Sequence, residues 1–274
     1  MLLKEIESFL EEDLGPDDYG GIVPYTDCKA EITAKEEGVL AGLEEAKQIF
    51  DYFSVHYSTE FENGNRIKSG DVILTVKGPG VKILKAERLV LNFLGQMSGV
   101  ATLTNVLVNE ARKVNEHVKV AGTRKTTPGF RKYEKKAIAI GGGDPHRFRL
   151  YETVILKDNH IKLMELEPAI KKAKEQVSFT RKIEVEVESI DEALRAAELK
   201  VDIIMLDNMT AVEVKECVQL LTERGLRDGL ILEASGGINM ENIKDFASTG
   251  VDVVSLGMIT HSAHSLNFSL NVVE

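Results

Sequence analysis

The sequence has few cysteines and no long apolar segment, and both absences exclude classes of protein. Its 274 residues include two cysteines, Cys28 and Cys217, which lie far apart in different kinds of segment. A disulfide framework and a metal knuckle are therefore not expected, and a reducing cytoplasm is the default. No apolar run approaches the roughly 20 residues needed to cross a bilayer. The N-terminus, MLLKEIESFLEEDLG, predicts an amphipathic helix and not a signal peptide, because acidic residues interrupt it.

The chain also lacks an excess of positive charge, since 34 Lys and Arg stand against 44 Asp and Glu, giving a net charge of −10. A pI near 5.3 argues against binding to nucleic acids or to anionic membranes. There is no low-complexity tract and no evident internal repeat. The length and the ordinary apolar fraction of 43% predict one large or two modest domains with a sizeable core.

One segment is basic against this acidic background. Residues 119–162 carry eleven Lys and Arg and four Asp and Glu, a net charge of +7. A basic segment in an acidic protein suggests a binding site for a small molecule with several negative charges. Three of its lysines, Lys132, Lys135 and Lys136, fit a solvated surface well. The other basic residues fit it less well, because they end or follow apolar runs and stand among Gly and Pro.

The hydrophobic pattern changes near residue 115, which predicts a domain boundary there. Residues 1–114 predict an α+β sandwich domain with linking helices, and residues 83–114 predict two helices broken at Ser98-Gly99. Residues 115–274 alternate short apolar runs with amphipathic helices, as expected for strands buried on both faces of a parallel α/β fold. The C-terminal SLNFSLNVV alternates like a strand and is a candidate to return to the first domain.

The fold of residues 115–274 is predicted to be an incomplete (β/α) barrel, with a doubly wound sheet as the alternative. The apolar runs are Val118–Gly122, Thr153–Leu156, Ile183–Val187, Ile203–Leu206, Leu230–Ala234 and Val251–Leu256. Polar residues stand at or just past their C-terminal ends, where a barrel builds its active site. These are Thr123-Arg124-Lys125, Lys157-Asp158-Asn159, Glu186, Asp207-Asn208, Ser235-Gly236-Gly237 and Gly257.

Two of these strand ends predict a phosphate site. Ser235-Gly236-Gly237 precedes a predicted helix, and Gly257 ends the next strand. Glycine allows close backbone approach, free N–H groups at a helix start favour phosphate, and the loops after the last two barrel strands often bind it. Either feature alone would more often be a tight turn, but their occurrence on consecutive strands favours phosphate.

Two acids predict a magnesium site beside that phosphate. Glu186 and Asp207 end adjacent strands, and each alone would more often be a surface charge. Mg²⁺ keeps several waters and takes only one or two carboxylates, so this pair suits an ion that bridges phosphate oxygens. Glu184 is either a second acid or a structural partner. No His and Cys set has zinc spacing, so a transition-metal site is not indicated.

The basic side chains exceed what one phosphate needs, which predicts a substrate with several negative groups. Arg binds a carboxylate through two N–H groups, whereas Lys offers a point charge. The candidates are Arg124, Lys125, His146, Arg147 and Lys157, with Arg131 and Arg149 ranked below them. Each alone has an ordinary explanation, such as a surface ion pair or a core histidine. Gly141-Gly142-Gly143 lacks the dinucleotide-binding spacing, so it predicts no nicotinamide cofactor.

At these residues the chain resembles the quinolinate phosphoribosyltransferase family, also called carboxylating nicotinate-nucleotide pyrophosphorylases. Nine motifs in order carry the resemblance over nearly the whole chain. They are AERLVLN (86–92), SGVAT (98–102), TRKTTPGFR (123–131), GGGDPHR (141–147), ILKDNHI (155–161), IEVEVES (183–189), IIMLDN (203–208), EASGGI (233–238) and VDVVSLGMIT (251–260).

The resemblance implies a fold, a reaction and an assembly. The fold is an N-terminal α/β sandwich joined to an incomplete α/β barrel. The assembly is a homodimer or a set of dimers, in which the partner's first domain covers each barrel mouth. The reaction, which belongs to NAD biosynthesis, converts quinolinate and phosphoribosyl pyrophosphate to nicotinate mononucleotide, pyrophosphate and CO₂, with Mg²⁺ as cofactor.

The matching motifs also imply roles for single residues. Arg88 would reach into the partner's site. The two carboxylates of quinolinate would be held by Arg88, Arg124, His146, Arg147 and Lys157, with Thr123 in the same substrate-binding set. Catalysis with the ribosyl pyrophosphate and its metal would fall to Lys125, Glu186 and Asp207. The 5′-phosphate would be held by Ser235, Gly236, Gly237 and Gly257.

Two segments depart from the family pattern. Residues 13–27 (DLGPDDYGGIVPYTD) stand where members commonly have a Gly-Asp-Leu-Thr-like segment, and Phe148-Arg149-Leu150 replaces a common Gly-Leu. A sister group encoded beside molybdenum transport genes, with another acceptor, is one alternative. It tends to lose the Lys-Asp-Asn-His motif, whose presence at Lys157 to His160 favours quinolinate. A non-enzymatic phosphometabolite-binding barrel is the other alternative, against which the intact acids argue.

Overall fold

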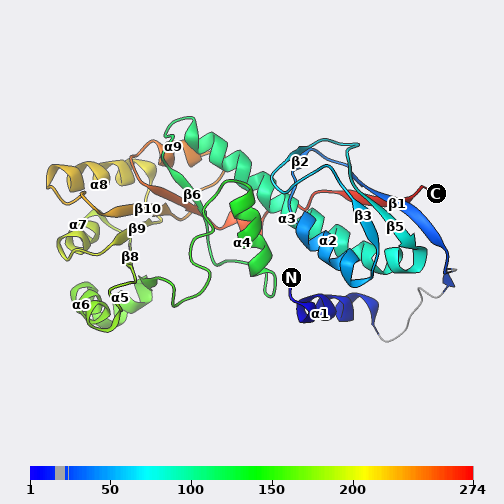
Figure 1. Cartoon of the computed structure of the whole chain (residues 1–274). Helices are drawn as coiled ribbons and strands as arrows, with labels where there is room; N and C mark the ends of the chain where they lie inside the picture. Colours follow the sequence, from blue (N-terminus) through cyan, green and yellow to red (C-terminus); the bar gives the residue numbers. More distant parts are fainter. Residues whose placement is uncertain (16–21, 24, 274) are drawn as a thin grey trace. The chain divides into compact units, whose positions relative to one another are not determined.

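The structure is a computed structural model that describes residues 1–15, 22–23 and 25–273, and it divides into two compact units. Unit 1 contains Met1–Leu103 and Ala263–Glu274, and unit 2 contains Thr104–Ser262. Figure 1 colours the chain from its N-terminus in blue to its C-terminus in red. The division falls after residue 103 and not after residue 114. Residues 16–21 and 24 of the unusual segment at residues 13–27 lie outside the described residues, so whether that segment changes the acceptor is not tested by the structure.

Unit 1 is built on an antiparallel sheet with strand order β12-β1-β5-β3. The strands are β1 (Asp27–Ala34), β3 (His56–Ser58), β5 (Val72–Pro79) and β12 (Phe268–Val272), and β2 (Gly38–Val39) pairs separately with β4 (Arg66–Ile67). The C-terminal strand β12 pairs with β1, with Ile32 opposite Leu270. Helices α1 (Leu3–Leu14) and α2 (Leu43–Tyr52) also belong to unit 1. The N-terminal amphipathic helix is thus confirmed, and α1 buries Ile6 and Leu10.

Helix α3 (Gly80–Arg112) runs unbroken for 33 residues, so the predicted break at Ser98-Gly99 is wrong. These small residues serve close packing within unit 1. The Ser98 hydroxyl accepts the Ala41 N–H at 2.9 Å and donates to the Ala41 carbonyl at 3.1 Å. A Cβ atom added at Gly99 would lie 2.0 Å from the carbonyl oxygen of His264. The helix tolerates the glycine because backbone approach offsets a propensity cost of about 1 kcal/mol.

Unit 2 contains a six-stranded parallel sheet with strand order β6-β11-β10-β9-β8-β7. Its strands are β6 (Lys119–Gly122), β7 (Val154–Leu156), β8 (Ile183–Val187), β9 (Ile203–Asp207), β10 (Ile231–Ser235) and β11 (Val253–Leu256). Strands β7 to β11 are neighbours in chain order, and the first strand, β6, pairs with the last. This order is that of a barrel left open between β6 and β7. A doubly wound sheet would instead reverse its strand order at a switch point.

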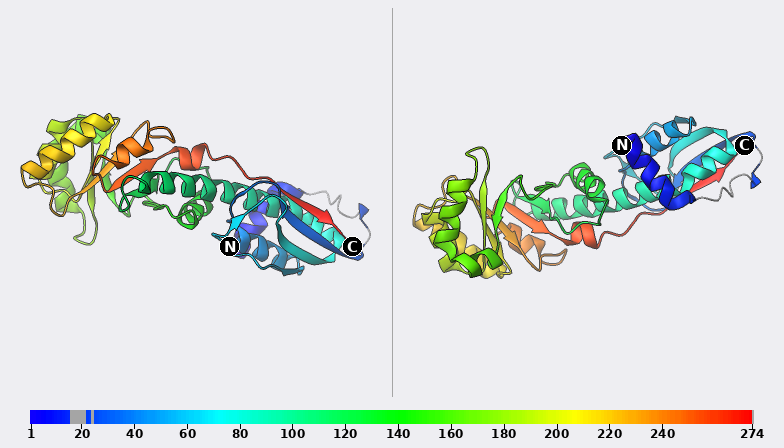
Figure 2. Two further views of the ribbon diagram at one scale, coloured as in Figure 1. Left: turned by 90° about the horizontal axis from the view of Figure 1, so that it is seen from above. Right: turned by 90° about the horizontal axis from the view of Figure 1, so that it is seen from below.

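The helices of unit 2 alternate with these strands. They are α4 (Arg131–Ile140), α5 (Asp158–Met164), α6 (Leu166–Gln176), α7 (Ile190–Glu198), α8 (Ala211–Glu223), α9 (Ile243–Ala247) and α10 (Met258–His261). Figures 1 and 2 show α6, α7 and α8, in yellow-green to gold, along one side of strands β8 to β10. Fully buried strand residues such as Val185, Ile204, Leu232 and Val254 form the core. In the described part of the chain, no helix combines the length and apolarity needed to span a membrane.

Candidate active site

A cavity of about 320 Å³ opens at the C-terminal ends of the parallel strands of unit 2. Nine of the thirteen residues predicted from sequence line it: Thr123, Arg124, Lys125, His146, Arg147, Lys157, Glu186, Asp207 and Ser235. Their strand-end positions explain the convergence, because parallel strands present their C-terminal ends at one edge of the sheet. The remaining lining residues are Gly122, Ile155, Met205, Glu233 and Ser255.

Three of the predicted glycines lie beside this cavity and shape its wall. Gly236 has φ +91° and Gly237 has φ +64°, directly after Ser235. A Cβ atom at Gly236 would fall within 2.6 Å of the Asn208 backbone nitrogen. A Cβ atom at Gly257 would meet the Lys125 side chain at 3.2 Å. Glycine at these positions therefore allows the turn after β10 and leaves room for the lysine stem.

The acidic part of the cavity consists of Glu186 and Asp207, at the ends of β8 and β9. Lys157 donates a hydrogen bond from Nζ to Glu186 Oε2 at 2.8 Å. Burial and the neighbouring carboxylate of Glu186 raise the pKa of Asp207 above its ordinary value. Asn208, with φ +56°, donates from its side chain to Asp207 Oδ2 at 2.8 Å. The pair thus holds more negative charge than its neighbours neutralise, which favours a cation beside it.

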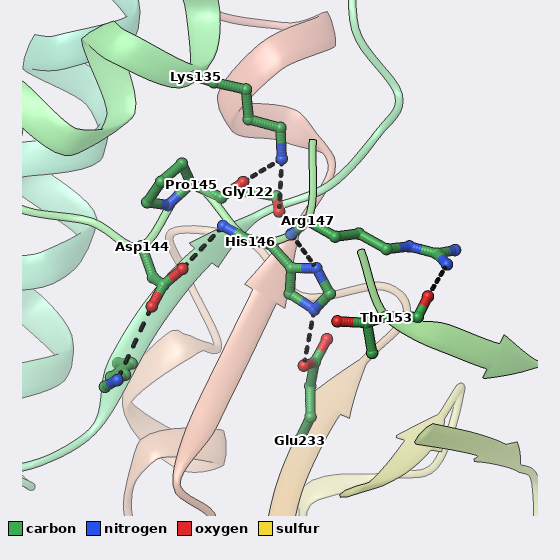
Figure 3. A network of polar contacts seen from close by, with 9 residues as sticks. Gly122, Lys135, Asp144, Pro145, His146, Arg147, Thr153 and Glu233 are labelled. Atoms are coloured by element: carbon green, nitrogen blue, oxygen red, sulfur yellow. Dashed lines mark hydrogen bonds and ion pairs between the residues drawn. The ribbon is translucent and has the colours of Figure 1, made fainter. Parts of the chain in front are cut away.

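His146 is fixed at both ring nitrogens, as Figure 3 shows. Its Nδ1 accepts the Arg147 N–H at 2.8 Å, so the other nitrogen, Nε2, carries the proton and lies 3.2 Å from Glu233 Oε2. Burial lowers the pKa of His146, but the hydrogen bond and charge of Glu233 outweigh burial and raise it. The residue has φ +54°, an uncommon conformation for a residue with a side chain, and Asp144 Oδ1 accepts its N–H at 2.7 Å.

Behind the histidine lie two buried acids, Glu184 and Glu233. Both oxygens of Glu184 and Oε1 of Glu233 have no hydrogen-bond partner among the described residues. Burial, and then the charge of Glu233, raise the pKa of Glu184 to about 7. The two carboxylates and the His146 ring place ligand atoms within 4.8 Å of one another, close enough to share a proton or a cation. Their negative charge acts on the Arg147 guanidinium group and partly offsets the fall in its pKa.

The five basic residues that line the cavity, which we call the basic rim, are Arg124, Lys125, His146, Arg147 and Lys157. Its two arginines differ in the hydrogen bonds that the protein makes to them. Arg147 donates to the Thr153 carbonyl at 2.7 Å and lies 3.5 Å from the Leu150 carbonyl. Burial, and next the charge of Arg124, lower the pKa of Arg147. Arg124 has a buried Nε without a hydrogen-bond partner in the part of the chain that the structure describes. A carboxylate would satisfy that nitrogen once the side chain turns it toward the cavity.

The other basic residues singled out from sequence lie elsewhere. Arg88 is on α3 in unit 1, where it lines a different cavity of about 360 Å³ with Glu36, Asn92 and residues 264–268. Arg131 donates to Thr126 Oγ1 at 2.9 Å, and Arg149 lies over the Phe148 ring. Neither of these two belongs to the described lining of the barrel cavity.

The sequence analysis missed Glu233 and Ser255, which line the cavity from β10 and β11. The signal that could have found them is the two-residue period of a strand, in which alternate side chains lie on the same face. Glu233 stands two residues before Ser235, and Ser255 stands two residues before Gly257, so each shares a strand face with a predicted site residue. The same spacing relates Glu184 to Glu186.

Comparisons with known proteins agree over nearly the whole chain. Residues 100–271 match the family described as "Quinolinate phosphoribosyl transferase, C-terminal domain", and residues 19–98 match its N-terminal counterpart. The "Probable nicotinate-nucleotide pyrophosphorylase [carboxylating]" of Methanothermobacter thermautotrophicus is 48% identical, over 89% of this chain and 88% of the relative. The human "Nicotinate-nucleotide pyrophosphorylase [carboxylating]" is 36% identical, over 97% and 90%.

A solved structure, "Crystal Structure of NadC from Streptococcus pyogenes", superimposes on the chain with a TM-score of 0.91. The two share 38% sequence identity, over 99% of this chain and 96% of that one. The likeness therefore covers both units and is accompanied by substantial identity.

Proposed function

The chain belongs to the quinolinate phosphoribosyl transferase family, and on that premise we propose how its barrel cavity performs the family's reaction. The enzyme is a pentosyltransferase of NAD biosynthesis. Quinolinate takes the phosphoribosyl group from phosphoribosyl pyrophosphate, and nicotinate mononucleotide, pyrophosphate and CO₂ are released. The observation that carries this assignment is one cavity lined by five basic side chains and by the carboxylates of Glu186, Asp207 and Glu233.

The cationic side suits a pyridine with two carboxylates. Arg124, Arg147 and Lys157 line one cavity, and a guanidinium binds a planar carboxylate through two parallel N–H groups. The unpartnered Nε of Arg124 supports a carboxylate as the missing acceptor. Thr123 and His146 complete the set, and the His146 ring accepts the Arg147 N–H and so fixes the backbone of that arginine.

The acidic side suits the sugar that loses pyrophosphate. Positive charge develops on the ribose carbon as the leaving group departs, and fixed carboxylates stabilise such charge without reorganising. Glu186 and Asp207 supply these carboxylates, and Lys125 balances the negative charge of the leaving pyrophosphate. The carboxylate pair also fits Mg²⁺, which takes one or two carboxylates and keeps its waters. When bound, the ion would neutralise pyrophosphate oxygens.

The glycine turn after β10 would hold the 5′-phosphate. Ser235, Gly236 and Gly237 offer a hydroxyl and backbone N–H groups at a turn with positive φ values, and Gly257 borders the same wall. The phosphate would anchor the sugar while its far side reacts.

Loss of CO₂ needs no further protein nucleophile. Once the pyridine nitrogen carries the ribosyl group, the ring is cationic and accepts the electron pair of the bond to the C2 carboxylate. The C2 carbanion then takes up a proton. The rim residues need only hold the ring and its remaining carboxylate in place.

The proposal includes a shared active site. Arg88 belongs to unit 1 and would enter the barrel cavity of a partner chain in a homodimer or an assembly of dimers. Two free cysteines, Cys28 and Cys217, suit a reducing compartment, which we propose is the cytoplasm.

The test is turnover with purified protein, Mg²⁺, phosphoribosyl pyrophosphate and quinolinate, followed by measuring nicotinate mononucleotide and CO₂ together. Equal amounts of both products are expected, and a chelator is expected to abolish them. Product from nicotinate but not from quinolinate would assign a different acceptor. Binding of both substrates without turnover would contradict an enzymatic role.

A further inference from the structure

Lys135 is buried, so the prediction that it belongs to a solvated surface is wrong. Its exposed fraction is 4%, although it lies in the basic segment next to exposed Lys132. Both stand on α4, and Arg131 precedes Lys135 by four residues, so those two side chains are neighbours on the helix. Glu134 is buried beside Lys135, whereas Lys132 is exposed. Burying an ammonium group is costly unless hydrogen bonds compensate it, so the position has a specific purpose.

The ammonium of Lys135 contacts two loops at once, as Figure 3 shows. Its Nζ donates to the Pro145 carbonyl and lies 3.5 Å from the Gly122 carbonyl. Gly122 ends β6 and immediately precedes Thr123, Arg124 and Lys125. Pro145 immediately precedes His146 and Arg147. One buried cation therefore joins the starting points of the two loops that carry most of the basic rim.

Two neighbours on α4 hold the same loops. Arg131 donates from Nε to Thr126 Oγ1 at 2.9 Å, and its NH1 lies 3.4 Å from the Phe148 carbonyl. The Glu134 carboxylate accepts the Thr127 N–H, at 3.2 Å to each oxygen. We call Arg131, Glu134 and Lys135 the loop clamp. It ties residues 122–127 to residues 144–148 through one helix.

The rim has a reason to need such a clamp. Arg124 and Arg147 come from different loops and are close enough that the charge of Arg124 lowers the pKa of Arg147. Before a dianion binds, the two guanidinium groups repel each other. The carboxylates of quinolinate sit on adjacent ring atoms, so their spacing is fixed. Two guanidinium groups held at a matching distance bind them without the cost of ordering the loops.

We propose that Lys135 is a positioning residue that fixes the spacing of Arg124 and Arg147 and thereby sets recognition of the quinolinate dicarboxylate. The inference rests on the proposed function for the identity of the substrate. Lys135 does not belong to the described lining of the cavity, so it acts through the loops and not by touching substrate.

The test compares Lys135→Met and Lys135→Gln with Lys132→Met, a matched control on the exposed face of the same helix. Steady-state kinetics vary each substrate in turn, with thermal unfolding as the stability readout. Both Lys135 variants are expected to raise KM for quinolinate about tenfold or more, the effect of losing a hydrogen bond from a charged group. KM for phosphoribosyl pyrophosphate changes much less, and the control matches wild type.

Several results would overturn the proposal. A Lys135 variant with wild-type KM for quinolinate would do so. A fall in kcat and Tm with both KM values unchanged would show a structural role only. If the methionine variant does not fold, the glutamine variant, which keeps a hydrogen-bond donor, carries the same comparison.

Failure of the proposed function would be seen separately, as wild-type protein that makes no nicotinate mononucleotide from quinolinate. Amide hydrogen exchange in the ligand-free protein then tests the clamp without any substrate. The amides of Asp144 and of residues 146–148 are expected to exchange faster in Lys135→Gln than in Lys132→Met. Equal exchange in the two variants would contradict the proposed positioning role.

Discussion

Arg124 is a cavity residue whose hydrogen-bonding groups are not all satisfied by the protein itself. Its Nε is buried without a hydrogen-bond partner among the described residues, just past the end of β6. A buried donor left unpaired costs free energy that a ligand can recover. In the proposed reaction, that ligand is a carboxylate of quinolinate.

Substituting Arg124 therefore tests the assignment of the cationic side. Arg124→Ala is expected to weaken quinolinate binding by ~1.5–3 kcal/mol, through loss of a charge-assisted bidentate contact, with a much smaller effect on phosphoribosyl pyrophosphate. Arg124→Lys restores charge but not the paired geometry, so it recovers only part of the loss. Calorimetric titration with each substrate measures this. Equal losses for both substrates would contradict the assignment.

The pH dependence of stability tests the burial of Lys135. Burial, and then the charge of Arg131, lower its pKa from 10.5 to about 8. Between these values the unfolded chain binds a proton that the folded chain has released, so the free energy of unfolding rises with pH. Urea unfolding of wild type and Lys135→Met across this window isolates the effect, because the other groups cancel. The wild type is expected to gain stability relative to the variant as pH rises. A constant difference would show that the amine is solvated.

Sequence reasoning predicted most single residues of the cavity but misjudged burial on α4. Thr123, Lys157 and Asp207 were found because strand ends converge in a barrel. Lys135 was assigned to solvent because its neighbours are lysines too, and only packing against residues 122 and 145 shows otherwise. Glu233 was overlooked because the motif that it opens, EASGGI, was interpreted through its serine and glycines.

At the scale of elements, helix α3 shows how a small residue can mislead. Glycine in a helical pattern is read as a break, yet Gly99 is where the helix meets the backbone of His264. The parallel strands were predicted much more closely. The predicted run Ile183–Val187 is β8 residue for residue, although Glu184 and Glu186 interrupt its apolar residues. A close approach between two backbone segments, such as that at Gly99, leaves no local pattern in the sequence.

Gly99→Ala tests this account of α3. Alanine is the better helix former by about 1 kcal/mol, but its Cβ would lie 2.0 Å from the His264 carbonyl oxygen. The clash is expected to dominate and to destabilise the protein by ~1–3 kcal/mol in thermal unfolding. Gly80→Ala is the control, because its Cβ meets its nearest neighbour at an ordinary 3.4 Å. A variant at Gly99 as stable as this control would show that the close packing is dispensable.

At the scale of the whole molecule, strand order identifies the architecture. The first strand of unit 2 pairs with the last, and the others follow in chain order, which is how a barrel is wound. Sequence reasoning reached this fold from the placement of polar residues. It did not reach the division after residue 103, because α3 continues through that point without any change in its helical pattern.

A shared active site predicts recovery of activity when two defective chains are mixed. Arg88→Ala and Lys125→Ala are each expected to be nearly inactive as pure proteins. Unfolding and refolding them together is expected to restore about a quarter of wild-type activity, since half the dimers are mixed and each has one intact site. Assays across mixing ratios measure this. Activity that stays at the level of the pure variants would argue that Arg88 serves its own chain or no site.

The most direct measurement is a crystal structure of the protein with quinolinate and a non-reactive phosphoribosyl pyrophosphate analogue. The account predicts carboxylate oxygens within about 3 Å of the Arg124 and Arg147 guanidinium groups, and the ribose carbon beside Glu186 and Asp207. Quinolinate bound outside the barrel mouth, or a ribose directed away from both acids, would contradict it.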